Sequence, residues 1–313
     1  MERGTQLKLE LFVENVRRAK EGLGFANAMA RRDVAFLYAL NEKPINCDAI
    51  KSVYALVKSS KLHFRKGAAV FIAAMLSLES DPKRMFDRIR TVYGMMNDAG
   101  YKKSSFLVFA AYLVASKTGP EEYQRKVDWM RTFRNSKKLR SKYKDIDECI
   151  PSAMLALLGQ DVEGVAERVD MFHMHLAQNI SGNSNMLNHK TARVMAAAGM
   201  VGTASMDRPI AIRDAFALQK VAIPSSVFGA FALLPGNIDV MVQEYIEVQT
   251  FIKSKKEING RFVSKDEVFL YAAAITARGH EDGAEIETML ATVSWVLMRC
   301  LRAGHRILLL PLW

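Results

Sequence analysis

The hydrophobic and polar positions along the chain follow a two-part pattern that occurs twice in succession between Phe64 and Leu139. The first copy is an apolar, alanine-rich run at 68–80, AAVFIAAMLSLES, and then an amphipathic run, KRMFDRIRTVYGMMND. The second copy is SFLVFAAYLVASK, a Gly119-Pro120 turn and EEYQRKVDWMRTFRN. Apolar residues spaced three and four apart are typical of helices that bury one face. The pattern therefore predicts a helical hairpin repeated in tandem.

The rest of the chain divides in the same way. A small residue marks the middle of the first helix of each unit, and these residues recur roughly every 40 positions: Ala35, Ala73, Ala110, Ala153, Ala196, Ala232 and Ala273. Such a period is typical of helical solenoids, in which each unit contacts its neighbours. We expect an all-α fold, an α-solenoid-like array of about seven helical hairpins over 33–303, within a single domain spanning 1–313.

The two helices of each predicted unit differ. The first is apolar nearly all round, as expected of a helix that lies between neighbouring units. The second carries an apolar stripe, such as Met85, Ile89, Val92 and Met96, and leaves its charged residues to solvent. Proline is tolerated in the first turn of a helix, so three proline-containing turns signal the start of these second helices. They are Asp81-Pro82, Gly119-Pro120 and Asp207-Arg208-Pro209.

Both ends of the chain have distinct patterns. Residues 1–24 place Leu9, Phe12, Val13 and Val16 on one helical face, which predicts a helix that caps the first repeat. The tail at 304–313 is strongly apolar. It either covers the open face of the last repeat or docks on a partner or a membrane surface, and it is too short to span a bilayer.

The charge of the chain narrows the choice of partners. Half of the residues are apolar, a quarter are charged, and the formal net charge is +11. This balance favours an anionic partner, or serves solubility alone. The chain has no secretory hydrophobic region and no apolar run of about 20 residues, so we expect no membrane span and a cytoplasmic protein.

A basic run contributes much of that charge. It consists of Arg131, Arg134, Lys137, Lys138, Arg140, Lys142 and Lys144, with no acidic residue between Met130 and Lys144. Such a cluster can neutralise the phosphates of a nucleic acid. A solvated loop is the alternative interpretation.

A second polar segment, NISGNSNMLNHK, begins at Asn179. Asparagine and serine clusters usually form loops, and such a loop can also present N–H donors to an anion. Its candidate binding residues are Asn183, Asn185, Asn188 and His189.

No residue pattern indicates catalysis, a cofactor or a metal. His173 and His175 point about 200° apart on a helix and cannot share one ion. Asp170 and His173 could share a face, but a second copy of the motif is missing. The chain has no G-x-S-x-G, P-loop, H-E-x-x-H or dinucleotide fingerprint. We assign no catalytic, cofactor or metal residues.

Two families resemble this sequence. The register of IRTVYGMMNDAGYKKSSFLVFAAYLVA is similar to tetratricopeptide and pentatricopeptide repeats, and the latter read single-stranded RNA through polar residues at fixed positions. Those positions are not regularly polar in this chain. LELFVEN, AAMLSLESDPKRMFDRIRTVY and SGNSNMLNHKTARVMAA resemble an uncharacterised helical family of Gram-positive bacteria, the domain of unknown function numbered four thousand and three. That resemblance implies a helical fold and no specific activity.

Three functions follow as hypotheses. A protein-binding scaffold or adaptor is favoured, because helical arrays offer large surfaces. The second is an RNA-binding protein that uses the Arg131–Lys144 run, and the third is an enzyme with a site between helices. A protein or nucleic-acid partner is therefore expected, and no pattern sets the oligomeric state.

Overall fold

The computed structural model describes residues 3–60, 62, 66–136, 149–159, 161–179, 192, 195–196, 203–221, 236–258, 263 and 265–279. Within these ranges the chain forms helices and no strands, so the predicted all-α class is confirmed. Among the helices described, none is both long and apolar enough to cross a bilayer.

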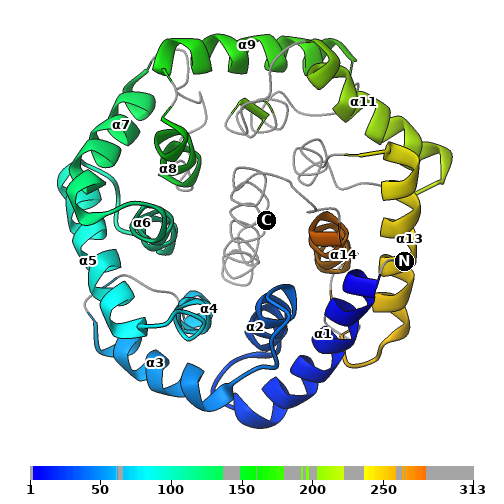
Figure 1. The fold of residues 1–313 in the computed structure, drawn as a ribbon, viewed down its shortest axis with the longest axis horizontal. Helices are drawn as coiled ribbons and strands as arrows, with labels where there is room; N and C mark the ends of the chain where they lie inside the picture. The colour runs from blue at the N-terminus through cyan, green and yellow to red at the C-terminus, as the bar shows by residue number, and fades with distance from the viewer. Residues whose placement is uncertain are drawn as a thin grey trace, which may run out of the picture.

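The helices form two concentric rings (Figure 1). The outer ring contains α1 (Arg3–Gly22), α3 (Cys47–Ser59), α5 (Pro82–Asp98), α7 (Tyr123–Asn135), α9 (Val162–Asn179), α11 (Thr203–Leu218) and α13 (Ile238–Ser254). The inner ring contains α2 (Ala28–Leu40), α4 (Lys66–Leu76), α6 (Ser105–Lys117), α8 (Cys149–Leu158) and α14 (Lys265–Gly279). A short 3-10 helix, η1 (Pro120–Glu122), precedes α7.

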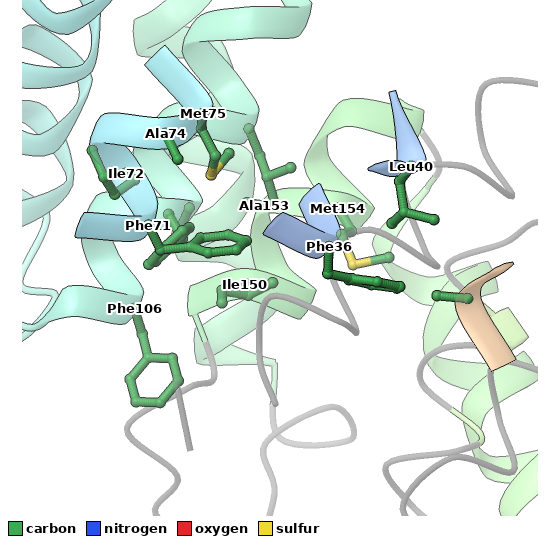
Figure 2. Packing of buried hydrophobic residues seen from close by; sticks show 14 of the residues in the cluster. Phe36, Leu40, Phe71, Ile72, Ala74, Met75, Phe106, Ile150, Ala153 and Met154 are labelled. Carbon is green, nitrogen blue, oxygen red and sulfur yellow. The ribbon is translucent and has the colours of Figure 1, made fainter. Parts of the chain in front are cut away.

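Burial explains why the inner and outer helices differ in sequence. Ten of the 13 residues of α6 are buried, whereas α5 buries only the stripe that contains Met85, Ile89, Val92 and Met96. The apolar residues labelled in Figure 2 come from the inner helices α2, α4, α6 and α8. The small residues predicted in the middle of the first helices are buried at Ala35, Ala73, Ala110, Ala153, Ala196 and Ala273, while Ala232 lies outside the described residues.

The sequence pattern did not reveal which neighbouring helices pair to form each hairpin. Each of α1, α3, α5, α7 and α13 packs most extensively against the inner helix that follows it in the chain. The predicted units instead grouped each inner helix with the outer helix after it. The hairpins therefore start one helix earlier than expected, and α1 is the outer helix of the first hairpin.

The expected solenoid-like array is not confirmed, and the first and last described hairpins contact each other. Helix α1 contacts α13 and α14, and α2 contacts α14 (Figure 1). The Thr5 hydroxyl donates to the Glu244 carboxylate at 2.8 Å, and the Tyr271 hydroxyl donates to Asp33 at 2.7 Å. Helix α1, which was expected to cap an open end, thus lies between α2 and the last described hairpin. Residues 280–313, including the apolar tail, are outside the described residues.

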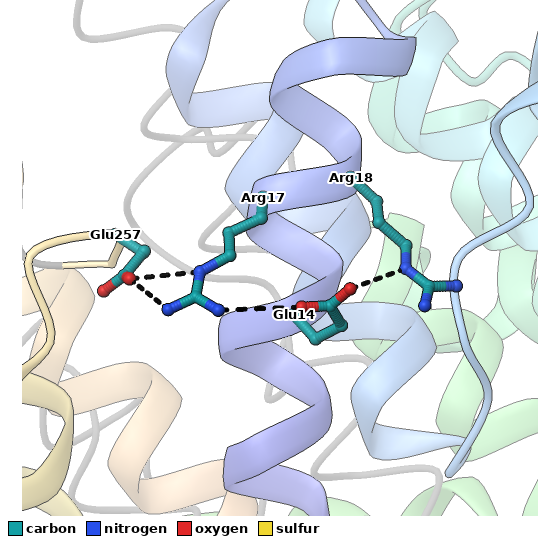
Figure 3. A network of polar contacts seen from close by, with 4 residues as sticks. All are labelled: Glu14, Arg17, Arg18 and Glu257. Carbon is teal, nitrogen blue, oxygen red and sulfur yellow. Dashed lines mark hydrogen bonds and ion pairs between the residues drawn. The ribbon is translucent and has the colours of Figure 1, made fainter.

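Aromatic and ionic contacts complete this closure. The Tyr271 ring lies 5.0 Å from that of Phe12 and 4.7 Å from that of Phe36, measured between centroids. Figure 3 shows the exposed side of the same junction, where Arg17 of α1 donates two hydrogen bonds to Glu257. Glu14 pairs with both Arg17 and Arg18 in this network.

Basic residues of outer helices cover the C-terminal ends of neighbouring inner helices. The Lys126 ammonium of α7 donates to the carbonyl oxygens of Ala156 and Leu157, at the end of α8. Arg88 of α5 donates to the carbonyl oxygen of Thr118, the residue that follows α6. The last carbonyl groups of a helix have no partner within it and carry partial negative charge, so these cations stabilise both inner helices.

The structure describes all three predicted helix starts, and at Gly119-Pro120 the proline begins the 3-10 helix η1, which leads into α7. Asp81 caps α5 by accepting from the backbone N–H of Arg84 at 2.9 Å, and Pro82 occupies the first helical turn. Helix α11 instead begins at Thr203, so Pro209 lies inside it rather than in its first turn. Proline lacks an N–H and leaves one carbonyl of the preceding turn without its usual donor, so this helix tolerates a local break in its hydrogen bonding.

Candidate functional site

The described connections at the two ends of the inner helices carry opposite charge. Figure 1 shows inner helices such as α4 and α6 nearly end-on, with the outer helices running around them. Connections that follow outer helices lead into the N-terminal ends of the inner helices, and connections that follow inner helices leave their C-terminal ends. We call the first end the basic end: its described connecting residues include five lysines and one acidic residue, namely Lys102, Lys103, Lys220, Lys255, Lys256 and Glu257. We call the second the acidic end: its described connecting residues include six acids and one lysine, namely Glu42, Glu79, Asp81, Glu121, Glu122, Asp161 and Lys43.

Helix dipoles account for part of this asymmetry. Acidic residues favour the N-termini of helices and basic residues the C-termini, and the outer helices all start at the acidic end. Lys20, Lys58 and Arg134 in their last turns fit that explanation. Lys102 and Lys103 do not fit that explanation, because they precede α6, whose N-terminus repels cations. Some of the charge at the basic end therefore has no role in stabilising helices.

The structure places only part of the predicted basic run. Arg131 and Arg134 lie one turn apart near the end of α7, whereas Lys137, Lys138, Arg140, Lys142 and Lys144 lie outside the described residues. The described part of this run sits at the basic end, since α7 finishes there. The polar segment with Asn183, Asn185, Asn188 and His189 also lies outside the described residues, and it follows Asn179, where α9 ends.

Arg134 connects the predicted run to residues that the sequence pattern did not single out. Its guanidinium carbon lies over the ring of Tyr101, 4.8 Å from the centroid. Tyr101 directly precedes Lys102 and Lys103, both of which are exposed. Packing of the α5–α6 turn onto α7 brings these four residues together. The Lys-Lys pair was visible in the sequence, but its proximity to Arg134 depends on tertiary packing.

Local structure fixes the position of Tyr101. Gly100 ends α5 with a φ of +88°, a left-handed conformation that glycine adopts without strain. The next residue, Tyr101, is 6% exposed, and its hydroxyl donates to the carbonyl oxygen of Met130 at 2.8 Å. Ser104 then caps α6 by accepting from the backbone N–H of Leu107. This turn is therefore held rigidly against α7.

A groove of about 400 Å³ lies on the outer wall between α5 and the start of α7. Asp81, Lys83, Arg84 and Tyr123 are among its lining residues. The groove is open to solvent and mixes acids with bases, so its charge selects no ligand class.

A group of buried and partly buried ionisable residues joins α2 to α14. Arg32 and Glu267 form an ion pair at 3.1 Å, next to the Asp33–Tyr271 hydrogen bond. Burial lowers the pKa of Arg32, but Tyr271, Glu267 and Asp33 outweigh it, so the pKa lies above its ordinary value. A permanently charged arginine paired with carboxylates stabilises the closed ring and supplies no base or nucleophile for chemistry.

The described residues also include the histidines that were considered as metal ligands in the sequence. No group of three His, Cys, Asp or Glu residues gathers within the described part of the chain. The His175 imidazole lies 3.1 Å from the Asp207 carboxylate, in a contact between α9 and α11. This contact is an inter-helix pair with one carboxylate, which is too few ligands for a stable metal site.

The comparisons with known proteins identify a family and leave the activity open. Searches of the curated proteins and of the solved structures found no match to this chain. A family model described as "Protein of unknown function (DUF4003)" matches residues 15–301, nearly the whole sequence. The resemblance drawn from the sequence motifs is thereby confirmed, and the chain belongs to the DUF4003 family.

Proposed function

We propose that the protein is a non-catalytic, cytoplasmic binding protein whose partner is single-stranded RNA, held at the basic end of the ring. The observation that supports this most is the separation of charge between the two ends. Lysine and arginine neutralise phosphates and release the counterions of a nucleic acid, which provides most of the affinity of sequence-independent binding. Arg134, Lys102 and Lys103 form the described centre of this surface.

The shape of the ring favours a single strand over a duplex. The lysines of the basic end belong to connections after α5, α11 and α13, which lie at different positions around the ring (Figure 1). A partner that contacts several of them must bend along the rim. Duplex DNA resists bending over a length of about 150 base pairs, whereas an unpaired strand bends freely at each nucleotide.

Fluorescence anisotropy with a labelled uridine-rich RNA of about 20 nucleotides tests the proposal. If Lys102, Lys103, Arg131 and Arg134 each contact one phosphate, the expected salt dependence weakens binding about 50-fold between about 50 and 200 mM salt. The K102E/K103E variant should bind at least about tenfold more weakly than the wild type at about 50 mM salt. Absence of binding by the wild type at that salt concentration would remove the proposal.

A matched control changes two residues at the N-terminal end of α5, the helix whose C-terminal end leads to Lys102 and Lys103. K83E/R84E makes the same change in net charge at two exposed positions in the first turn of α5, at the acidic end. We expect this variant to bind RNA as the wild type does, apart from a small effect of total charge. Equal losses in both variants would show that net charge, not the basic end, is responsible. Binding to phosphatidylserine vesicles without binding to RNA would also overturn the proposal.

A protein scaffold is the second candidate, and a different surface favours it. The inner helices are buried, so a scaffold would use the outer wall or the ends of the ring. Met171 and Met174 lie one turn apart on α9 with exposed fractions of 36% and 61%. Exposed methionines are common at protein-binding surfaces because the side chain adapts its shape. A complex that persists after nuclease treatment and is lost in M171E/M174E would favour this function over RNA binding.

A further inference from the structure

Within the described residues, Arg88 and Arg134 each lie over a tyrosine ring, and they differ in their hydrogen bonds. The Arg88 guanidinium, 5.8 Å from the ring centroid of Tyr123, donates to the Tyr123 hydroxyl and to the carbonyl oxygen of Thr118. Arg88 therefore serves the junction of α5, α6 and α7. The Arg134 guanidinium, 4.8 Å from the ring centroid of Tyr101, donates no side-chain hydrogen bond to a residue that the structure describes.

The Arg134 side chain nevertheless has a fixed surface to pack against. The Tyr101 ring beneath it is buried and anchored to Met130, as described above. Gly100 leaves room on the adjacent side, where a methyl group in place of its hydrogen would lie 3.5 Å from Arg134 Nη1. A guanidinium that is oriented before binding loses little conformational entropy when a ligand arrives. Its N–H donors can then form hydrogen bonds with that ligand.

We propose that Arg134 recognises one backbone phosphate of the bound RNA as a bidentate fork, and that Tyr101 is the positioning residue that orients it. This inference rests on the proposed function. Two parallel N–H donors match two oxygens of a phosphate, whereas a lysine acts as a point charge. Lys102 and Lys103 are exposed and sit beside this fork, where they neutralise neighbouring phosphates. Arg134 thus fixes the register of the strand on the ring.

The distinguishing variant is Arg134→Lys, which preserves charge and removes the fork. At about 50 mM salt we expect it to bind the uridine-rich RNA about tenfold more weakly, with the slope of log K against log salt unchanged. Lys102→Ala should instead make that slope shallower by about 0.7, the value for one phosphate contact with a single strand. An R134K variant that binds within about twofold of the wild type would show that Arg134 contributes only its charge.

Variants of Tyr101 test the positioning role. Tyr101→Phe keeps the ring and should bind nearly as the wild type does. Tyr101→Leu should weaken binding as much as R134K, and the double variant Y101L/R134K should add no further loss. Because Tyr101 is buried, the melting temperature of each variant is measured to show that it folds. Y101F/R134K is the double variant that keeps the aromatic ring, and it should bind as R134K does. Additive losses in Y101L/R134K would overturn the role of Tyr101.

The nature of the contact is tested with a second RNA. Recognition of a phosphate predicts that the R134K loss is the same for adenine-rich and uridine-rich strands. A loss confined to one of them would mean that Arg134 stacks on a base, which contradicts the phosphate fork. If K102E/K103E weakens binding and R134K does not, the fork is wrong and the basic end still binds RNA. If the wild type does not bind RNA at all, the proposed function itself fails.

Discussion

Arg32 and Glu267 lie 235 positions apart in the chain and form an ion pair with 3.1 Å between Nη2 and Oε1. Their side chains are 9% and 13% exposed, so the pair is largely removed from water. It joins α2 to α14 and connects the first described hairpin to the last. The buried polar groups of this junction contrast with the apolar packing between the other inner helices (Figure 2).

Removing one partner of this pair should destabilise the ring. Glu267→Ala leaves the buried Arg32 guanidinium without its carboxylate, and we expect the free energy of unfolding to fall by about 3 kcal/mol. Chemical denaturation followed by circular dichroism measures this change. The double variant R32M/E267M should lose less than the sum of the single variants, because it leaves no buried charge unpaired. Strictly additive losses would mean that the two side chains do not interact.

The exposed pair at the same junction provides the control. Arg17, which is 56% exposed, contacts Glu257 across the junction of α1 and the α13–α14 connection (Figure 3). Solvent and salt screen such pairs, so Glu257→Gln should leave the denaturation midpoint unchanged within error. A loss comparable to that of Glu267→Ala would show that closure depends on the exposed network and not on the buried pair.

A charge in the middle of an inner helix should prevent folding. Ala110 is fully buried on α6, where nearly every residue lacks contact with water. Ala110→Glu places a carboxylate there without a partner, and we expect a loss of more than about 4 kcal/mol, enough to abolish cooperative thermal unfolding. Ala55→Glu, the same change at an exposed position of α3, is the control and should melt as the wild type does. An unaltered melting curve for A110E would contradict the burial of α6.

The lysine that covers the end of α8 should contribute measurably to stability. Burial lowers the pKa of Lys126, whose ammonium donates to the carbonyl oxygens of Ala156 and Leu157 at 3.0 and 3.4 Å. Lys126→Met leaves both carbonyl groups without this charged donor, and we expect a loss of about 2 kcal/mol by urea denaturation. The neighbouring Arg125→Met makes the same change in charge at an exposed position and should have little effect. Equal effects of the two variants would show that net charge, not the cap, matters.

Buried tyrosines should make the fold sensitive to alkaline pH. Burial raises the pKa of Tyr112 well above its ordinary value of 10.0, and the nearby Glu79 carboxylate, which accepts from the Tyr112 hydroxyl, raises it further. Above about pH 10 the unfolded chain loses this proton and the folded chain keeps it, so stability falls as pH rises, by about 1.4 kcal/mol per pH unit. Below about pH 10 both states are protonated and this contribution is fully present.

Tyr112→Phe tests this dependence. The variant should lose about 1 kcal/mol near neutral pH, because the hydrogen bond to Glu79 is gone. Its stability should then decline less steeply than that of the wild type between about pH 10 and 12, as measured from urea denaturation at each pH. Tyr245, whose pKa burial also raises, keeps part of the dependence in both proteins. Parallel declines of wild type and variant would exclude Tyr112 as a source of alkaline sensitivity.

The candidate site was only partly predictable from the sequence. The concentration of positive charge identifies Arg131 and Arg134 directly, because a run of cations without acids is a local feature. The contact of Arg134 with Tyr101, next to Lys102, was not predictable, because Tyr101 and Lys102 belong to another helical connection. The buried junction of Arg32, Glu267 and Tyr271 was missed for the same reason: no spacing along the chain links residues more than 200 positions apart.

The sequence by itself determined the helices, their repeat and the faces they bury, because the apolar spacing and the Asp81-Pro82 cap act within one or two turns of chain. Tertiary structure alone decided that each hairpin runs from outer to inner helix and that α1 meets α13 and α14. Closure depends on the small rotation between successive hairpins, which the packing of side chains sets and which accumulates around the ring. The repeated outer-to-inner order places the lysines of separate connections at the same end of the inner helices, where we place the RNA.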